Sequence, residues 1–162
     1  MSTLTTINLI QAANRTLYPA YFKTVPTFDK YPLTADSVRL PMILTWPDAG
    51  TWSRQGFGGK KRDDTVYVML VFVTALGQGE MPARSSLAVE LRDALRTFWL
   101  SVDQNGYPTA LQNPGDEDPP TQVSLEFDGQ YPQVSAIGGT ALTVGGTPYT
   151  GFELRIKVRE LW

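Results

Sequence analysis

The sequence contains no cysteine and no histidine among its 162 residues. Without cysteine the chain cannot form a disulfide, a zinc–thiolate site or a thiol nucleophile. Without histidine it lacks the usual general base near neutral pH and the commonest metal ligand. No Ser-x-x-Lys pattern replaces the missing serine-type triad. We therefore expect a protein that is not an enzyme and that uses no cofactor and no metal.

A strong excess of charge of one sign and long hydrophobic runs are also missing. The chain has 14 Lys and Arg residues against 16 Asp and Glu residues, a net charge of -2, whereas a dedicated nucleic-acid-binding domain is usually basic. No apolar run approaches the roughly 20 residues that span a bilayer. The N-terminal stretch has no basic residue before its apolar residues, unlike a secretory signal. We predict a protein with no membrane partner and no sequence-specific nucleic-acid partner, made in a reducing compartment.

A chain of this length is expected to form a single domain, 1–162. Apolar residues at helical spacing predict a short amphipathic helix over 4–17. Three prolines then exclude long regular structure from a proline-rich arm, 18–37. The arm is too apolar for a free linker, so we expect it to pack over the body of the protein or against another chain. Its five aromatic residues are Tyr18, Tyr21, Phe22, Phe28 and Tyr31.

Two predicted strands follow, over 38–46 and 65–75, and a long polar hairpin loop, 47–64, joins them as an antiparallel pair. Pro41 places the first strand at a sheet edge or at a bulge, because proline cannot donate to a strand ladder. The second run, "TVYVMLVFVTA", is apolar without alternation and rich in β-branched residues. This composition favours a central strand that is covered on both faces.

The clearest helix is predicted after the second strand, with Pro82 in its first turn. Val89 and Leu100 lie on the face opposite its main apolar arc, among Arg92 and Arg96. Scattered exposed apolar residues are common on protein surfaces; the alternative is that this second face contacts a neighbouring subunit. The main arc spans roughly 140°. Its residues are Leu87, Leu91, Ala94, Leu95, Phe98, Trp99 and Val102.

The last part of the chain predicts several short strands and one long strand. Gly145-Gly146 indicates a tight hairpin turn. In the final segment, "GFELRIKVREL", apolar residues alternate with Arg155, Lys157 and Arg159 on the opposite face. We expect that face to be solvent-exposed, or to line an assembly or pair with an acidic neighbour. No aromatic residues interleave with these charges, which argues against a nucleic-acid groove. The predicted fold is α+β: a mostly antiparallel (mixed) sheet packed against two α-helices.

Glycine and lysine lie together in "TWSRQGFGGKKRDD", as they do in phosphate-binding loops. A P-loop needs G-x-x-x-x-G-K-[ST] between a strand and a helix. Here a second lysine replaces the hydroxyl residue, the first glycine is missing, and the next predicted element is a strand. We interpret this stretch as a solvated loop or, because Trp and Arg are enriched at interface hot spots, as a contact loop. The candidate contact residues are Trp52, Phe57, Lys60, Lys61 and Arg62.

Two groups of carboxylates are the remaining candidates for chemistry. Asp63 and Asp64 could act as a pair, but we place them in the loop 47–64, where they would lack the fixed geometry that acid–base catalysis requires. The run of three acidic residues in 113–121 lacks the alternating spacing and the glycine of a calcium loop. We interpret 113–121 as a solvated acidic loop.

The order of elements is a short helix, a proline-rich arm, a hairpin, an amphipathic helix and antiparallel strands that end in "YTGFELRIKVREL". This order resembles the tail-terminator proteins of long-tailed bacteriophages and, more loosely, their head-tail joining (neck) and minor tail proteins. The resemblance implies a subunit with helices against a sheet that closes into a homo-oligomeric ring, usually a hexamer. Such a ring caps the tail-tube protein, stops its polymerisation and docks the head-tail connector protein. The resemblance thus places the protein in the virion neck or tail, assembled in the host cytoplasm.

Two other functions fit the same sequence. A tail-tube subunit, or another neck or head-completion subunit, would share the strand-rich body, but tube subunits stack into open cylinders. A small ligand-binding domain, or an enzyme without a recognisable motif, would be monomeric or dimeric and would hold a closed apolar pocket. Ring closure needs heterologous contacts between unlike surfaces of each subunit. The residues that we expect at such contacts are Trp52, Phe57, Lys60, Lys61, Arg62, Val89, Arg92, Arg96, Leu100, Arg155, Lys157 and Arg159.

Overall fold

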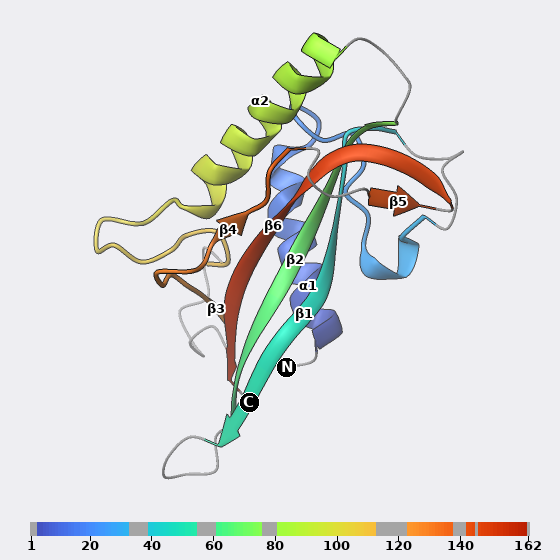
Figure 1. Ribbon diagram of the computed structural model, residues 1–162. Coiled ribbons are helices and arrows are strands. Elements are labelled where there is room, and N and C mark those ends of the chain that lie inside the picture. The colour runs from blue at the N-terminus through green and yellow to red at the C-terminus, as the bar shows by residue number, and fades with distance from the viewer. Residues whose placement is uncertain are drawn as a thin grey trace.

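The main body of the protein is a curled antiparallel sheet with two α-helices, one before and one after the first hairpin in the chain. This is the α+β fold predicted from the sequence (Figure 1). The computed structural model describes residues 3–32, 39–54, 61–75, 81–112, 123–137, 142–144 and 146–161. The α-helices in these ranges are α1 (Thr3–Asn14) and α2 (Met81–Trp99), and two short 3-10 helices span Arg15–Leu17 and Phe28–Lys30. The strands are β1 (Met42–Arg54), β2 (Lys61–Ala75), β3 (Val123–Glu126), β4 (Gln133–Val134), β5 (Leu142–Val144) and β6 (Thr147–Leu161).

The sheet is built around β6. The main strand order is β1-β2-β6-β3, and β4 and β5 also pair with β6. All pairings between the described strands are antiparallel. The two-residue connection from β5 to β6 confirms the hairpin turn predicted at Gly145-Gly146, where Gly146 has a φ of 82° that favours glycine. The first strand lies at the sheet edge, as Pro41 indicated, and begins directly after this proline.

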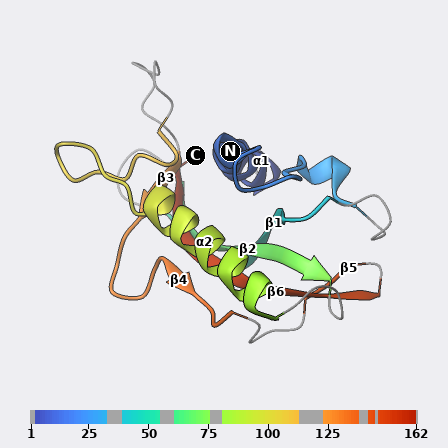
Figure 2. The ribbon, with the colours of Figure 1, turned by 90° about the horizontal axis from the view of Figure 1, so that it is seen from above.

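The core lies between one face of the sheet and both helices. α1 lies beside β1, and α2 crosses over β2 and β6 (Figure 2). The alternation predicted for the last strand is confirmed, because its apolar side chains are all buried on this face. Ile10 of α1 and Leu91, Leu95 and Trp99 of α2 pack against them. The helix ends at Trp99, so Val102, which the periodicity assigned to the buried arc, is instead exposed.

Two buried polar side chains of α1 tie the layers together. The Gln11 amide donates hydrogen bonds to the carbonyl oxygens of Pro26 and Ile43, at 2.8 and 3.0 Å, and accepts one from the Thr45 hydroxyl. The Asn14 side-chain oxygen accepts a hydrogen bond from the Trp99 indole at 3.0 Å. Because an unpaired polar group in the core is costly, these bonds fix α1 against the arm, β1 and α2 at once.

The described part of the proline-rich arm packs on its own subunit. Phe22 is fully buried in the core, and the rings of Phe28 and Tyr31 pack against Trp46 with centroids 5.3 and 5.4 Å away. The Tyr31 hydroxyl donates to the Thr45 carbonyl and accepts from the Thr45 amide, both at 2.9 Å. Burial raises the pKa of Tyr31 to about 12, so the hydroxyl keeps the proton that this pair of bonds requires. Residues 33–37 of the arm lie outside the described residues.

The long loop predicted over 47–64 is much shorter in the structure. β1 continues to Arg54 and β2 begins at Lys61, so Asp63 and Asp64 belong to a strand and not to a loop. The prediction was wrong because it interpreted the polar, glycine-containing stretch after Trp46 as a solvated loop. A register shift between Pro47 and Gly50 accommodates the proline as a bulge, after which the pairing resumes.

β2 is central, as predicted, but its two faces are covered unequally. One face is buried in the main core along its length. On the other face Phe72 is buried in a second, smaller cluster, whereas Val66 and Val68 are half-buried. The strands approach closely beside this cluster, since a Cβ at Gly151 would lie 1.9 Å from the Val71 carbonyl oxygen. The sheet thus exposes part of its outer face.

Candidate functional site

The second face of α2 is exposed, as its pattern predicted. Val89 and Leu100 expose 47% and 46% of their surfaces, and Arg92 and Arg96 lie between them along the helix. The spacing of these four residues places them on one side of the helix. We name Val89, Arg92, Arg96 and Leu100 the α2 stripe. Whether the stripe meets a neighbouring subunit stays a prediction.

The two arginines of the α2 stripe differ in their partners. Arg96 forms an ion pair with Asp93 at 3.0 Å, and both side chains are more than half exposed. An exposed pair of this kind contributes about 0–1 kcal/mol. Arg92 is half-buried, and none of the carboxylates in the described ranges pairs with it. The half-buried cation of the stripe is therefore the one without an acidic partner in that part of the chain.

A groove of about 150 Å³ lies beside the α2 stripe, between α2 and the strands β4 and β6. Arg92, Arg96 and Leu100 of the stripe line it. We name it the α2–β4 groove. Its apolar wall is made by Leu95, Trp99, Pro132, Val134, Phe152 and Leu154. It combines an apolar floor with two guanidinium groups at its rim.

The basic face of β6 behaves differently from the α2 stripe, because acidic side chains of the same subunit neutralise it. Arg159 lies 3.3 Å from Asp64 and 3.4 Å from Glu126. Arg62, a candidate from the hairpin, also pairs with Asp64, at 2.8 Å. Burial alone would raise the pKa of Asp64, but hydrogen bonds and charge from the two arginines outweigh it and hold the pKa below its ordinary value.

The other two basic residues of this face are paired in the same way. Arg155 binds Asp48 across the sheet and Glu153 on its own strand, the latter at 3.0 Å. Lys157 lies 3.3 Å from Asp128. Of the alternatives that the sequence left open for this face, pairing with acidic residues is the one observed, and the acidic residues belong to the same chain. We name this set of ion pairs the β6 ladder.

The remaining candidates lie at the tip of the β1–β2 hairpin, where the structure describes few side chains. Trp52 pairs with Asp63 and Lys61 with Arg54 in the backbone ladder between β1 and β2. The side chains of Trp52 and Lys61, and the whole of Phe57 and Lys60, lie outside what the structure describes. Of the five contact-loop candidates, the structure brings only Arg62 together with another candidate, through their shared partner Asp64.

A buried polar pair closes the end of the core next to this tip. The Tyr67 hydroxyl donates to the Glu160 carboxylate, and Glu160 pairs with Asp63 across the β2–β6 ladder. Burial first, and then the hydrogen bond and charge of Glu160, raise the pKa of Tyr67. The tyrosine therefore stays protonated at neutral pH and acts as a hydrogen-bond donor, which is a structural role. Sequence reasoning missed this pair because its two residues lie 93 positions apart and only the register between β2 and β6 brings them together.

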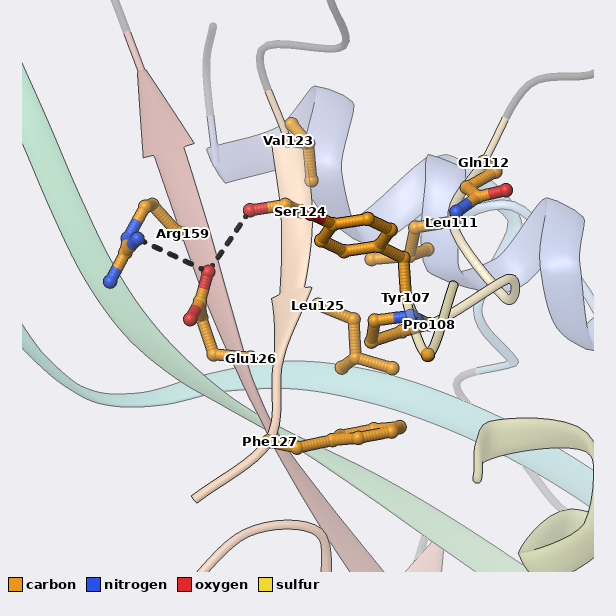
Figure 3. Close-up of a pocket in the computed structure, with 11 residues that line it drawn as sticks. Tyr107, Pro108, Leu111, Gln112, Val123, Ser124, Leu125, Glu126, Phe127 and Arg159 are labelled. Carbon is orange, nitrogen blue, oxygen red and sulfur yellow. Dashed lines mark hydrogen bonds and ion pairs between the residues drawn. The ribbon is translucent and has the colours of Figure 1, made fainter. Parts of the chain in front are cut away.

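A second hollow, of about 580 Å³, lies beside β3 (Figure 3). Tyr107, Pro108 and Leu111 form one wall, and Leu125 and Phe127 form the other. Figure 3 shows these apolar side chains on one side of β3, with Ser124, Glu126 and Arg159 on its other side. Little in the sequence indicates this hollow, because the residues of its two walls are separated along the chain by residues 113–121 and come together only in the fold.

The backbone of β3 adds to this surface. Of the described strands only β6 pairs with β3, which makes β3 an edge strand. Such a strand leaves alternate N–H and C=O groups without a ladder partner. Tyr107 and Phe127 beside it are 65% and 38% exposed. The hollow therefore offers apolar rings and backbone hydrogen-bonding groups together, which suits contact with an extended chain.

The described residues offer little for catalysis. They contain no group of three or more acidic, histidine or cysteine side chains that could hold a metal ion. Glu126, the carboxylate at the hollow, is hydrogen-bonded to Ser124 at 3.2 Å and paired with Arg159. Within the same ranges, no helix is long and apolar enough to cross a membrane.

Comparison with models of known protein families found no match to this chain, and comparison with curated protein sequences found no significant relative. Function must therefore be argued from the surfaces described above.

Proposed function

We propose that this chain is a structural subunit that closes into a ring, which we take to be a hexamer, and terminates the tail tube of a long-tailed bacteriophage. The observation that carries the proposal is the presence of two unlike exposed surfaces on one subunit. The α2 stripe with its groove is basic and apolar, whereas the hollow beside β3 combines aromatic rings with an open strand edge. A ring needs two different surfaces of this kind on every subunit.

The activity of such a subunit is assembly. One surface of the ring would pair with the last layer of the tail-tube protein, and the other would receive the head-tail connector protein. The ring would stop polymerisation because its outer surface lacks what another tube layer requires. No cofactor and no catalytic step enter this scheme, and the protein would act in the virion neck after assembly in the host cytoplasm.

Light scattering and negative-stain imaging of the purified protein test this proposal. A closed ring, or a monomer that forms a single ring on tube ends, is the expected result. Long stacked cylinders would instead identify a tail-tube subunit. A monomer or dimer that ignores tubes would contradict both structural functions.

The second candidate is a small ligand-binding domain, and the hollow beside β3 is the observation that favours it. Its volume of about 580 Å³ falls within the range of roughly 300–1,000 Å³ of small-molecule sites. Such sites enclose most of their ligand, however, whereas Tyr107 in this wall is 65% exposed. Binding of a small molecule by a monomeric protein would favour this candidate.

A further inference from the structure

The α2–β4 groove has a chemistry that calls for a particular kind of occupant. Its floor is apolar and includes the edge of Trp99, while Arg92 and Arg96 stand at its rim. Arg92 has no carboxylate partner in the described ranges, although it is half-buried. A guanidinium in this position binds carboxylates through paired, charge-assisted hydrogen bonds. The matching ligand is an extended segment that carries both carboxylates and apolar residues.

The chain itself contains one segment with this chemistry. Residues 113–121 read "NPGDEDPPT", with three consecutive carboxylates, no basic residue and two prolines directly after the acidic run. Proline-rich segments adopt an extended conformation at little entropic cost and dock in grooves lined by aromatic residues. The carboxylates match the two arginines, and the prolines match the apolar floor.

The segment is flanked by residues that lie away from the groove. It is anchored at Gln112 and Val123, which both line the hollow beside β3. Val123 pairs with Glu160 on β6, whereas the groove residue Val134 pairs with Leu154, about 20 Å away along the strand. Asp118, five residues before Val123, reaches at most about 18 Å. A segment that binds the groove of another subunit does not have to span this distance.

We propose that the α2–β4 groove of one subunit binds residues 113–121 of a neighbouring copy of this chain. Asp116, Glu117 and Asp118 of the neighbour neutralise Arg92 and Arg96, and Pro119-Pro120 covers the apolar floor beside Leu100. This inference rests on the proposed ring and names two of the surfaces that meet in it. The contact is heterologous, because it joins the groove of one subunit to a different part of the next subunit.

Charge reversal on each side of the contact tests the inference. The groove variant is Arg92→Glu/Arg96→Glu, and the segment variant is Asp116→Lys/Glu117→Lys/Asp118→Lys. Each variant alone places like charges at every contact, so each is expected to fall to a lower oligomer mass by light scattering, with an unchanged circular dichroism spectrum. A control for the groove variant, Lys23→Glu/Lys30→Glu, makes the same change of net charge as that variant at exposed positions outside the groove and is expected to keep the wild-type mass.

Mixing the two variants in equal amounts is the decisive step. In an alternating ring each reversed groove meets a reversed segment and each native groove meets a native segment, so the wild-type mass is expected to return. If either variant keeps the wild-type mass, or if the mixture fails to restore it, this docking is wrong although the ring itself may stand. A segment bound within its own subunit would give no restoration on mixing.

A peptide experiment gives an answer even if the wild-type protein proves monomeric, the result that contradicts the ring. A labelled peptide of residues 113–122 is titrated by fluorescence anisotropy into the segment variant, whose own segment cannot compete. Saturable binding that weakens by about tenfold or more on adding Arg92→Glu/Arg96→Glu supports the groove as the docking site. Absence of binding, or binding that ignores the arginines, overturns it.

Discussion

The β6 ladder and the α2 stripe both present arginine at the surface, yet they differ in how their charge is balanced. In the ladder, Arg155, Lys157 and Arg159 each pair with a carboxylate of the same subunit. In the stripe, Arg92 has no such partner among the described residues and lies beside exposed Val89 and Leu100. A charge balanced inside the fold contributes to the stability of the subunit. A half-buried arginine without a carboxylate partner in the described ranges, next to exposed apolar side chains, is the feature on which the proposed docking rests.

The largest expected effect on stability comes from a residue on the buried side of α2, opposite the stripe. Trp99→Ala removes a fully buried ring and the hydrogen bond to Asn14, and large-to-small changes of this kind cost about 3–5 kcal/mol. The free energy of unfolding, measured by urea titration, should fall by that amount. A loss below about 1 kcal/mol would mean that α2 is not anchored through this residue.

A smaller effect is expected in the β6 ladder. Asp64→Asn removes the carboxylate shared by Arg62 and Arg159 and should lower the free energy of unfolding by about 1 kcal/mol at pH 7, within the range of partly exposed pairs. The oligomer mass should not change, because these partners lie within one subunit. A change in mass would place the ladder at an interface and remove the contrast with the stripe.

The same substitution has a pH dependence with a definite sign. The pKa of Asp64 is lower in the folded protein than its ordinary value of 3.8, so its contribution is present above that value and is lost as the pH falls through the folded pKa. The difference in unfolding free energy between wild type and Asp64→Asn should therefore be constant from pH 7 to 5 and shrink below pH 4. A difference that grows on acidification would contradict this assignment.

The smallest effect on stability is expected in the α2 stripe. Val89→Lys and Leu100→Lys change exposed positions, where substitutions usually alter the free energy of unfolding by less than about 0.5 kcal/mol. Each should nevertheless lower the oligomer mass, because the substitution removes apolar contact area from the proposed ring interface and puts a charged group in its place. Wild-type mass in both variants would remove the stripe from the interface and leave its apolar residues as ordinary surface.

Local patterns predicted the elements better than the contacts between them. The alternation in β6, the turn at Gly145-Gly146 and the exposure of Val89 and Leu100 depend on neighbouring residues and were correct. The predicted length of the first hairpin loop was wrong, because a polar, glycine-containing stretch can still pair as strand where its partner strand and a bulge allow it.

Which basic side chains have carboxylate partners could not be predicted from the sequence, for a related reason. The carboxylates of the β6 ladder come from β1, β2, β3 and the turn after β3, and only the strand order and register bring them to β6. The same holds for the hollow beside β3, whose walls are remote in sequence. The sequence could therefore name Arg92 and Arg159 as equal candidates but could not tell which of them was already satisfied.

The Tyr31 hydroxyl has a consequence for the exposed edge of the sheet at β1. It satisfies both backbone groups of Thr45 on the outer edge of β1, and Thr24 pairs beside it with the start of the same strand. One side chain thus takes the place of an absent strand, so this stretch of the sheet offers nothing to an incoming chain. The register places Thr45 level with Met69, Leu154 and Val134, so the protected stretch of β1 lies at the β4 end of the sheet and not at the β3 end. A strand from a second copy of the chain cannot extend the sheet over this stretch, which works against edge-to-edge aggregation of the free protein.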